Sequence, residues 1–202
     1  MRTRLIATER DKILQITLES DDGYPRLECE ILDPLVNQIA HLAGDSTLAG
    51  AMITGSERAF ATGAEITEIA KLTAAKAREF SRHGQMAMSA VANSEKPIVA
   101  AIRGYCIGGG LDLALACHSR IASRDAVFAH PGGSLGIITG WGGTQRLPRL
   151  IGRSIALEIL TTGRRCSAEE ALAVGLIREI VSPEEVTSAA MRLLRSCAKT
   201  DF

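Results

Sequence analysis

The stretch from Ile98 to Asp112 constrains the fold of this chain more than any other part of its sequence. An apolar run, Ile98–Ile102, is followed by three consecutive glycines, Gly108–Gly110, and then by a helix-forming segment that carries Asp112. Three glycines in a row cost backbone entropy that an ordinary connection would avoid. A helix that starts there presents backbone N–H groups without partners. The sequence therefore predicts a strand, a turn that can approach a ligand closely, and a helix with a carboxylate in its first turn.

Strand and helix patterns alternate along most of the chain. Apolar residues with helical spacing predict helices over residues 31–42, 74–92, 112–117, 155–161, 167–174 and 183–197. Short apolar runs bounded by turn residues predict strands over residues 5–8, 13–18, 49–54, 98–102, 120–123, 126–129 and 177–181. This alternation predicts an α/β fold. We expect a core over residues 1–182 and a C-terminal helical segment over residues 183–202.

Composition excludes several classes of partner. The 202 residues include 23 basic and 23 acidic side chains and only 3% aromatics, so neither the charge nor the stacking surface suits nucleic acid. Five cysteines without a Cys-x-x-Cys pair argue against a disulfide framework and a metal site, and they favour a reducing cytoplasm. The chain has no apolar run of 18 residues and its first residues are charged, so we expect no membrane segment and no leader.

A second segment of small residues, Ala59–Ile66, lies between an expected strand and an expected helix. Such residues let the backbone approach a ligand and offer N–H groups at the start of a helix. The same composition also suits an ordinary turn that caps a helix. The G-x-G-x-x-G fingerprint of dinucleotide-binding folds is absent from the glycine run, and the chain has no phosphate-binding P-loop.

Three ordered segments together resemble the crotonase superfamily of enoyl-CoA hydratases and isomerases. They are Ala59–Ile66 (AFATGAEI), Lys96–Gly110 (KPIVAAIRGYCIGGG) and Gly142–Arg149 (GGTQRLPR). The similarity runs from about Ile13 to the end of the chain. The resemblance implies a spiral of β-β-α units that binds an acyl-CoA thioester as substrate, without a separate cofactor. It also implies a homo-oligomer, a trimer or a dimer of trimers.

The resemblance assigns site residues to this chain. Two backbone N–H groups, those of Ala64 and Gly109, would polarise the thioester carbonyl as an oxyanion hole. Arg58 falls where a basic residue can meet a CoA phosphate, although an exposed arginine is usually only solvated. The turn that would lie along the CoA moiety contains Ala61, Ala64, Glu65, Ile66 and Thr67.

The acid and base positions depart from the family pattern. Asp112 stands where hydratases of the family carry their first catalytic glutamate, and Gly132 stands where they carry the second. Aspartate keeps the charge, but its side chain is about 1 Å shorter, and a displacement of that size can cost about 10²-fold in rate. Glycine supplies no proton. Gly140 stands where dienoyl isomerases and aromatic dehalogenases of the family carry an aspartate, so those activities lose support.

Four side chains each allow a catalytic and a structural interpretation, and for His83 these are a proton carrier and an ordinary helix residue. His130 could carry a proton near neutral pH, or it could be a packed histidine. Asp112 could act as an acid or base, or it could only complement the positive end of a helix. His83 lies within a helical run, and Trp141 fits a pocket wall or a core position better than a catalytic group.

Two further departures from the family pattern lie after the first expected hairpin and at the C-terminal end of the sequence. Leu27–Ile31 replaces the family's usual Asn-Ala-Leu segment after the first hairpin, which alters one wall of the CoA cleft. The sequence stops at Phe202, where relatives generally continue through further helices that cover the acyl pocket and help to build the oligomer. We expect a different association or a more open pocket.

The sequence therefore favours an acyl-CoA enzyme that hydrates, dehydrates or isomerises an unsaturated acyl-CoA, with Asp112 as the remaining acid or base. One alternative is a catalytically weak acyl-CoA-binding or assembly protein that keeps the fold. A third possibility is decarboxylation or hydrolysis that uses His130 and the same oxyanion hole.

Overall fold

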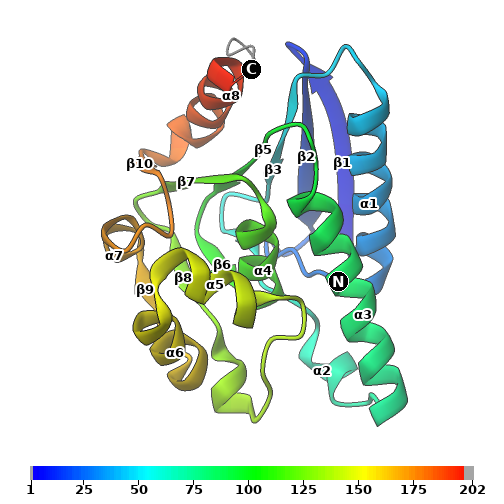
Figure 1. Cartoon of the computed structure of the whole chain (residues 1–202), viewed down its shortest axis with the longest axis vertical. Coiled ribbons are helices and arrows are strands. Elements are labelled where there is room, and N and C mark those ends of the chain that lie inside the picture. Colours follow the sequence, from blue (N-terminus) through cyan, green and yellow to red (C-terminus); the bar gives the residue numbers. More distant parts are fainter. Residues whose placement is uncertain (1, 198–202) are drawn as a thin grey trace.

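The computed structural model describes residues 2–197, and they form two sheets flanked by helices (Figure 1). The larger sheet has six strands in the order β1-β2-β3-β5-β7-β10. Strands β1 and β2 pair antiparallel, and the other neighbours pair parallel. The strands are β1 (Thr3–Arg10), β2 (Ile13–Ser20), β3 (Gly50–Thr54), β5 (Ile98–Ile102), β7 (Ser119–Ser123) and β10 (Glu179–Val181).

The smaller sheet has four short strands in the order β4-β6-β8-β9. They are β4 (Ala59–Ala61), β6 (Tyr105–Ile107), β8 (Val127–Ala129) and β9 (Cys166–Ser167). Three times a strand of the larger sheet leads directly into a strand of the smaller one and then into a helical segment. This is a succession of β-β-α units, as the family resemblance implies.

The helices cover both faces of the larger sheet. They are α1 (Cys29–Gly44), α2 (Ile66–Ile69), α3 (Ala74–Ala92), α4 (Gly109–Ala116), α5 (Gly143–Ile151), α6 (Arg153–Thr162), α7 (Ala168–Ala173) and α8 (Val186–Cys197), with short 3₁₀ turns η1 (Pro131–Leu135) and η2 (Pro183–Glu185). Helices α1 and α3 pack side by side (Figure 1). Among the described residues, no helix is both long enough and apolar enough to cross a membrane.

Strand β5 illustrates how the core is divided. Ile98, Ala100 and Ile102 face the main apolar cluster, which includes α1, α3 and α4. Val99 and Ala101 point to the opposite face and contact a smaller cluster completed by α8. Side chains alternate between the two faces of a strand, so a strand buried on both faces is apolar throughout. The apolar run Ile98–Ile102 therefore forms an inner strand of the larger sheet.

The predicted helices and strands all occur, with differences at some ends. The helix predicted from Asp112 begins earlier, at Gly109. Of the three consecutive glycines, only Gly108 has a positive φ, 57°, so the turn ends there and the next two glycines are helical. The strand predicted over residues 177–181 is limited to Glu179–Val181. The short strands β4, β6 and β9 and the helices α2 and α5 were not predicted. Residues 198–202 of the predicted C-terminal segment lie outside the described residues.

Candidate functional site

A cavity of about 260 Å³ lies where α2, the first half of α3 and the start of α4 meet the loop that follows β8. Most of its wall is apolar, and three of its polar side chains, those of Asp112, His130 and Thr139, lie together at what we call its polar end. The apolar lining includes Ile66, Ile69, Leu72, Ala77, Phe80, Leu135, Ile137, Ile138 and Trp141, and the polar lining includes Thr62, Ser81, Asp112, His130 and Thr139. An apolar cavity with a few convergent polar groups is the usual form of a small-molecule site.

The two small-residue segments meet at the wall of this cavity. Gly63 has a φ of 86°, and a Cβ atom on it would lie only 2.9 Å from the amide nitrogen of Gly109. A Cβ atom on Gly110 would lie 2.2 Å from the carbonyl oxygen of Ala61. Glycine is needed at both positions because the backbones touch. The turn that holds Ala64 is thereby packed against the start of α4.

The amides of Ala64 and Gly109 both belong to residues that line the cavity. Gly109 is the first residue of α4, so its N–H has no partner within the helix. Gly108, one residue earlier, donates its own N–H to the carbonyl of Ala129. Within residues 2–197, neither the Ala64 N–H nor the Gly109 N–H donates a hydrogen bond to another residue. The cavity wall therefore carries two backbone donors that are free to bind a ligand.

Trp141 forms another part of the wall and is only 3% exposed. Its ring centroid lies 5.2 Å from that of Phe80. A Cβ atom on Gly84 would lie 2.1 Å from the indole nitrogen, and one on Gly109 would lie 2.6 Å from Cζ3. The indole is thus held between α3 and α4. Trp141 is at once a core residue and a wall of the cavity, so both roles considered for it from the sequence apply.

The polar end of the cavity contains Asp112, His130 and Thr139. Asp112 and His130 are 1% and 3% exposed. The imidazole Nε2 of His130 lies 3.3 Å from Oδ1 of Asp112, without the alignment of a hydrogen bond. The hydroxyl of Thr139 donates to the other carboxylate oxygen, Oδ2. The structure therefore brings together two predicted residues and one, Thr139, that no sequence pattern singled out.

Asp112 bears the only carboxylate among the described residues that line the cavity. Gly132, which the resemblance predicts to stand where hydratases carry their second glutamate, also lines it. A Cβ atom on Gly132 would lie 2.8 Å from the carbonyl oxygen of Ile137, and one on Gly133 would lie 2.4 Å from that of Thr161. The loop after β8 is packed so closely at both glycines that it leaves no space for a side chain.

The remaining predicted CoA-contact residues lie outside the cavity lining, with the exception of Ile66. Ala61 is fully buried in β4. Glu65 forms an ion pair with Arg26 at 3.1 Å and accepts a hydrogen bond from Thr67. The exposed Arg58 guanidinium stacks on the ring of Tyr24, 4.4 Å from its centroid, and donates to its hydroxyl.

The cysteines and His83 take no part in the cavity. Burial raises the pKa of Cys106 well above its usual value, and it raises the pKa of Cys117 to about 12. Both thiols therefore stay protonated and are poor nucleophiles. His83 pairs with Asp33 at 2.6 Å between α3 and α1.

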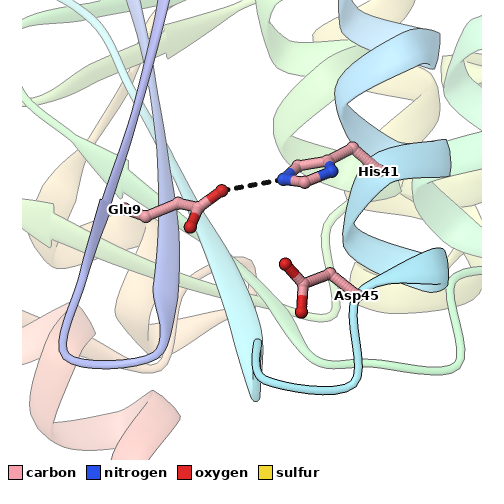
Figure 2. Close-up of side chains that lie close together, drawn as sticks. All are labelled: Glu9, His41 and Asp45. Atoms are coloured by element: carbon pink, nitrogen blue, oxygen red, sulfur yellow. Dashed lines mark hydrogen bonds and ion pairs between the residues drawn. The ribbon is translucent and has the colours of Figure 1, made fainter.

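Glu9, His41 and Asp45 form the one group of side chains, within the part of the chain described, that could hold a metal ion (Figure 2). The imidazole Nε2 of His41 lies 2.8 Å from Oε1 of Glu9, and Asp45 accepts two hydrogen bonds from Thr47. The group joins β1 to the C-terminal end of α1, at the opposite end of the molecule from α2 (Figure 1). The contact between His41 and Glu9 ties α1 to β1 at the protein surface, and the group is remote from the cavity.

Comparison with known proteins places the chain in a family. Residues 8–201 match the family described as enoyl-CoA hydratase/isomerase. A short-chain-enoyl-CoA hydratase of Clostridium acetobutylicum is 33% identical over 190 residues, which cover 94% of this chain and 73% of that protein. A crotonyl-CoA hydratase of Syntrophomonas wolfei is 36% identical over 183 residues, which cover 90% of this chain and 70% of that protein.

Solved structures agree with the sequence relatives. Enoyl-CoA hydratase from Bacillus anthracis superposes with a TM-score of 0.92 at 32% identity, covering 97% of this chain and 77% of that one. DspI of Pseudomonas aeruginosa superposes with a TM-score of 0.93 at 33% identity, covering 98% and 75%. The chain therefore has the crotonase fold and belongs to the enoyl-CoA hydratase/isomerase family of the crotonase superfamily.

Proposed function

We propose that this protein binds an acyl-CoA thioester with the carbonyl oxygen between the amides of Ala64 and Gly109, and that it stabilises the thioester enolate. The observation that carries the proposal is the pair of unpartnered amides on one cavity wall, on two turns that glycines hold in contact. A thioester that loses a proton from its α-carbon places negative charge on the carbonyl oxygen. Preorganised N–H donors in a site with little water stabilise that charge as it develops.

The lining of the cavity supports an acyl substrate. Ile66, Phe80 and Ile138 are among the apolar side chains that surround it, and its volume of about 260 Å³ can take a short or medium acyl chain. Two relatives are named for short-chain enoyl and crotonyl thioesters. We propose that this chain also acts on an unsaturated acyl-CoA, with no cofactor beyond the CoA carried by the substrate.

The reaction class follows from the groups at the polar end. Asp112 is the one carboxylate there, and Gly132 supplies no second acid. A site of this kind supports proton transfer on one side of the substrate better than hydration by two carboxylates. Isomerisation or reversible enolisation is therefore the chemistry we favour within the hydratase and isomerase class.

A catalytically weak acyl-CoA-binding or assembly protein is the second candidate. The observation that favours it is the missing carboxylate at Gly132, whose backbone lies too close to Ile137 for a side chain. In that case the oxyanion hole would bind the thioester without turnover. Decarboxylation or hydrolysis would instead yield product only from malonyl-type or β-dicarbonyl thioesters.

We also propose that the protein is cytoplasmic and that it forms a homo-oligomer. The free cysteines, three of them buried, suit a reducing cytoplasm. Apolar side chains of Leu135, Ile137 and Ile138 are exposed at the edge of the cavity, and a trimer or a dimer of trimers could cover them. Light scattering of the purified protein would determine its mass in solution.

Removal of one amide tests the oxyanion hole. Ala64→Pro replaces the N–H by a ring carbon, and Ala64→Ser keeps it as a matched control. We expect the rate at which the protein exchanges the α-proton of butyryl-CoA for deuterium in D₂O to fall about 10²-fold or more in Ala64→Pro. Exchange in Ala64→Ser should stay close to the wild-type rate.

A substrate analogue tests the same contact without a mutation. The butyl thioether of CoA lacks the carbonyl oxygen, so it should bind more weakly than butyryl-CoA in calorimetric titrations. Equal affinities for the two ligands would contradict the proposed position of the carbonyl. Tight binding of butyryl-CoA with neither exchange of its α-proton nor turnover of crotonyl-CoA would favour the binding protein over the enzyme.

A further inference from the structure

We propose that His130 and Asp112 act as one acid–base pair, in which His130 moves the proton at the substrate carbon, Asp112 holds the imidazole, and Thr139 positions Asp112. The inference rests on the proposed function and deepens it. It assigns the proton carrier that replaces the missing second glutamate of the family.

The three side chains come from separate segments and converge at the polar end of the cavity. Asp112 lies in the first turn of α4, His130 follows β8, and Thr139 lies in the loop before α5. Nε2 of His130 is 3.3 Å from Oδ1 of Asp112, and the Thr139 hydroxyl donates to Oδ2. A histidine that contacts a carboxylate held by a third group is the usual arrangement of an oriented general base.

The facing atoms of the pair are buried and unpaired. Oδ1 of Asp112 and Nε2 of His130 are both fully enclosed, and neither has a hydrogen-bond partner among the described residues. Buried polar atoms without partners are rare in native proteins, and they call for a functional explanation. A small rotation of the imidazole would align an Nε2–H with Oδ1. Catalytic hydrogen bonds are often misaligned without ligand and tighten in the substrate complex.

Asp112 is less accessible than His130. Its Oδ2 is occupied by Thr139, and its Oδ1 is covered by the backbone of Gly143, where a Cβ atom would lie only 2.2 Å away. On His130, only Nε2 is buried without a partner, and the residue lines the cavity. Nδ1 is therefore the nitrogen left to face a ligand, while the carboxylate stands behind the ring.

The position of His130 explains how the site can dispense with a side chain at residue 132. His130 and Gly132 belong to the same turn after β8, and both line the cavity. Gly132 has no space for a side chain beside the carbonyl of Ile137. The turn thus brings an imidazole to the region from which its packing excludes a carboxylate.

The proton transfer balances without any further reactant. Neutral His130 takes a proton from the carbon next to the thioester carbonyl, and the electrons of the broken C–H bond form the enolate. The negative charge moves to the oxygen held by the amides of Ala64 and Gly109, and the Asp112 carboxylate offsets the charge of the imidazolium. Return of the proton to the same carbon gives exchange. Its delivery two carbons further along an unsaturated chain gives a shifted double bond.

Deuterium exchange tests the pair directly. Butyryl-CoA is incubated with the protein in D₂O, and deuterium at its α-carbon is measured by mass spectrometry, because this reaction needs one base and an oxyanion hole only. We expect His130→Ala and His130→Gln to lower the exchange rate by about 10²-fold or more. Added imidazole should restore at least a tenth of the wild-type rate to His130→Ala but not to His130→Gln, which leaves no space for it. His83→Ala, outside the cavity, should exchange at the wild-type rate.

The positioning role of Thr139 has its own readout. Thr139→Val removes the hydroxyl and should lower the exchange rate about tenfold, while Thr139→Ser keeps it and should restore the rate. The affinity for butyryl-CoA, measured by calorimetry, should be the same in both variants. A general packing defect would lower the affinity as well, and Thr139→Ser would not correct it.

A folded His130→Ala variant that exchanges within threefold of the wild type, or that loses exchange without recovery in imidazole, would overturn the inference and leave the proposed function standing. A wild-type protein that binds butyryl-CoA without exchanging its α-proton would instead remove the proposed enolate chemistry and favour the binding protein. A wild-type protein that binds no acyl-CoA thioester would remove the proposed function itself.

Discussion

At the scale of single residues, glycine and one tryptophan determine the shape of the cavity. Trp141 fits only because Gly84 and Gly109 have no side chains where its ring lies. The ring in turn fixes the start of α4, where the proposed oxyanion donor Gly109 lies. Close backbone and ring packing of this kind leaves little freedom for substitution, since well-packed interiors do not accept added atoms without strain.

Gly132 offers the sharpest test of this packing. Gly132→Ala puts a Cβ atom 2.8 Å from a backbone oxygen, whereas Gly44→Ala at the end of α1 meets no atom within 4 Å. We expect Gly132→Ala to lower the free energy of unfolding by about 1–3 kcal/mol, measured by urea denaturation. Gly44→Ala should leave it unchanged or slightly higher.

The same contact decides whether the family's second acid could be restored. Gly132→Glu should be destabilised at least as much as Gly132→Ala and should not gain hydratase activity. A stable, more active Gly132→Glu would mean that the loop after β8 yields easily.

At the scale of elements, the long and strongly patterned segments were predictable, and the missed elements lack a pattern of their own. Helices α1 and α3 have enough residues to express a period in their sequence, and strand β5 is a continuous apolar run between turn residues. Strands β4, β6 and β9 have two or three residues each and no period of their own. Helix α5 begins with a glycine and contains Pro148, and both features are typical of a helix end rather than a helix. These elements form because the neighbouring strands and helices are already in place.

Helix α8 shows how one element completes the core. Its Leu194 is fully buried in the smaller apolar cluster, and a Cβ atom on Gly50 of β3 would lie 3.0 Å from its Cδ2. We expect Leu194→Ala to lower the free energy of unfolding by about 2–5 kcal/mol, because it leaves a cavity between α8 and the sheet. Leu157→Ala, at a side chain 63% exposed on α6, is the matched control and should change it by less than about 0.5 kcal/mol. Equal effects in the two variants would show that α8 adds little to the core.

At the scale of the whole molecule, basic and acidic residues are equal in number, but the fold lowers the pKa of some carboxyl groups and not of others. Hydrogen bonds from Ser20 and Tyr24, helped by Arg26, hold the pKa of Asp22 well below its usual value. Thr47 lowers the pKa of Asp45 in the same way. A carboxylate whose pKa is lower in the folded state stabilises the fold above its unfolded-state pKa, and it loses that contribution as the pH falls.

The folded protein should therefore lose stability in acid. We expect the free energy of unfolding, from urea denaturation at several pH values, to fall as the pH drops below about 4, where unfolded aspartate binds a proton. Asp22→Asn should be less stable than the wild type at pH 7, and the difference should shrink as the pH falls. The pKa of Glu28, which burial raises, acts in the opposite direction. A constant difference between wild type and Asp22→Asn at all pH values would contradict this explanation.

The sequence by itself determined the α/β class and the positions of the two glycine-bearing turns, because buried strands, helical periods and glycine runs leave a local pattern that needs no partner to be read. The crotonase fold was expected from the resemblance of its three ordered segments. From that resemblance we also predict that Asp112 and Gly132 stand where hydratases of the family carry their two glutamates. Only the tertiary structure decided that Thr139 binds Asp112 and that His130 faces it, since residues 27 and 18 positions away from Asp112 meet it through folding alone. The closeness of Gly132 to Ile137 is likewise a product of the folded loop, and it determines which acid can act in the cavity.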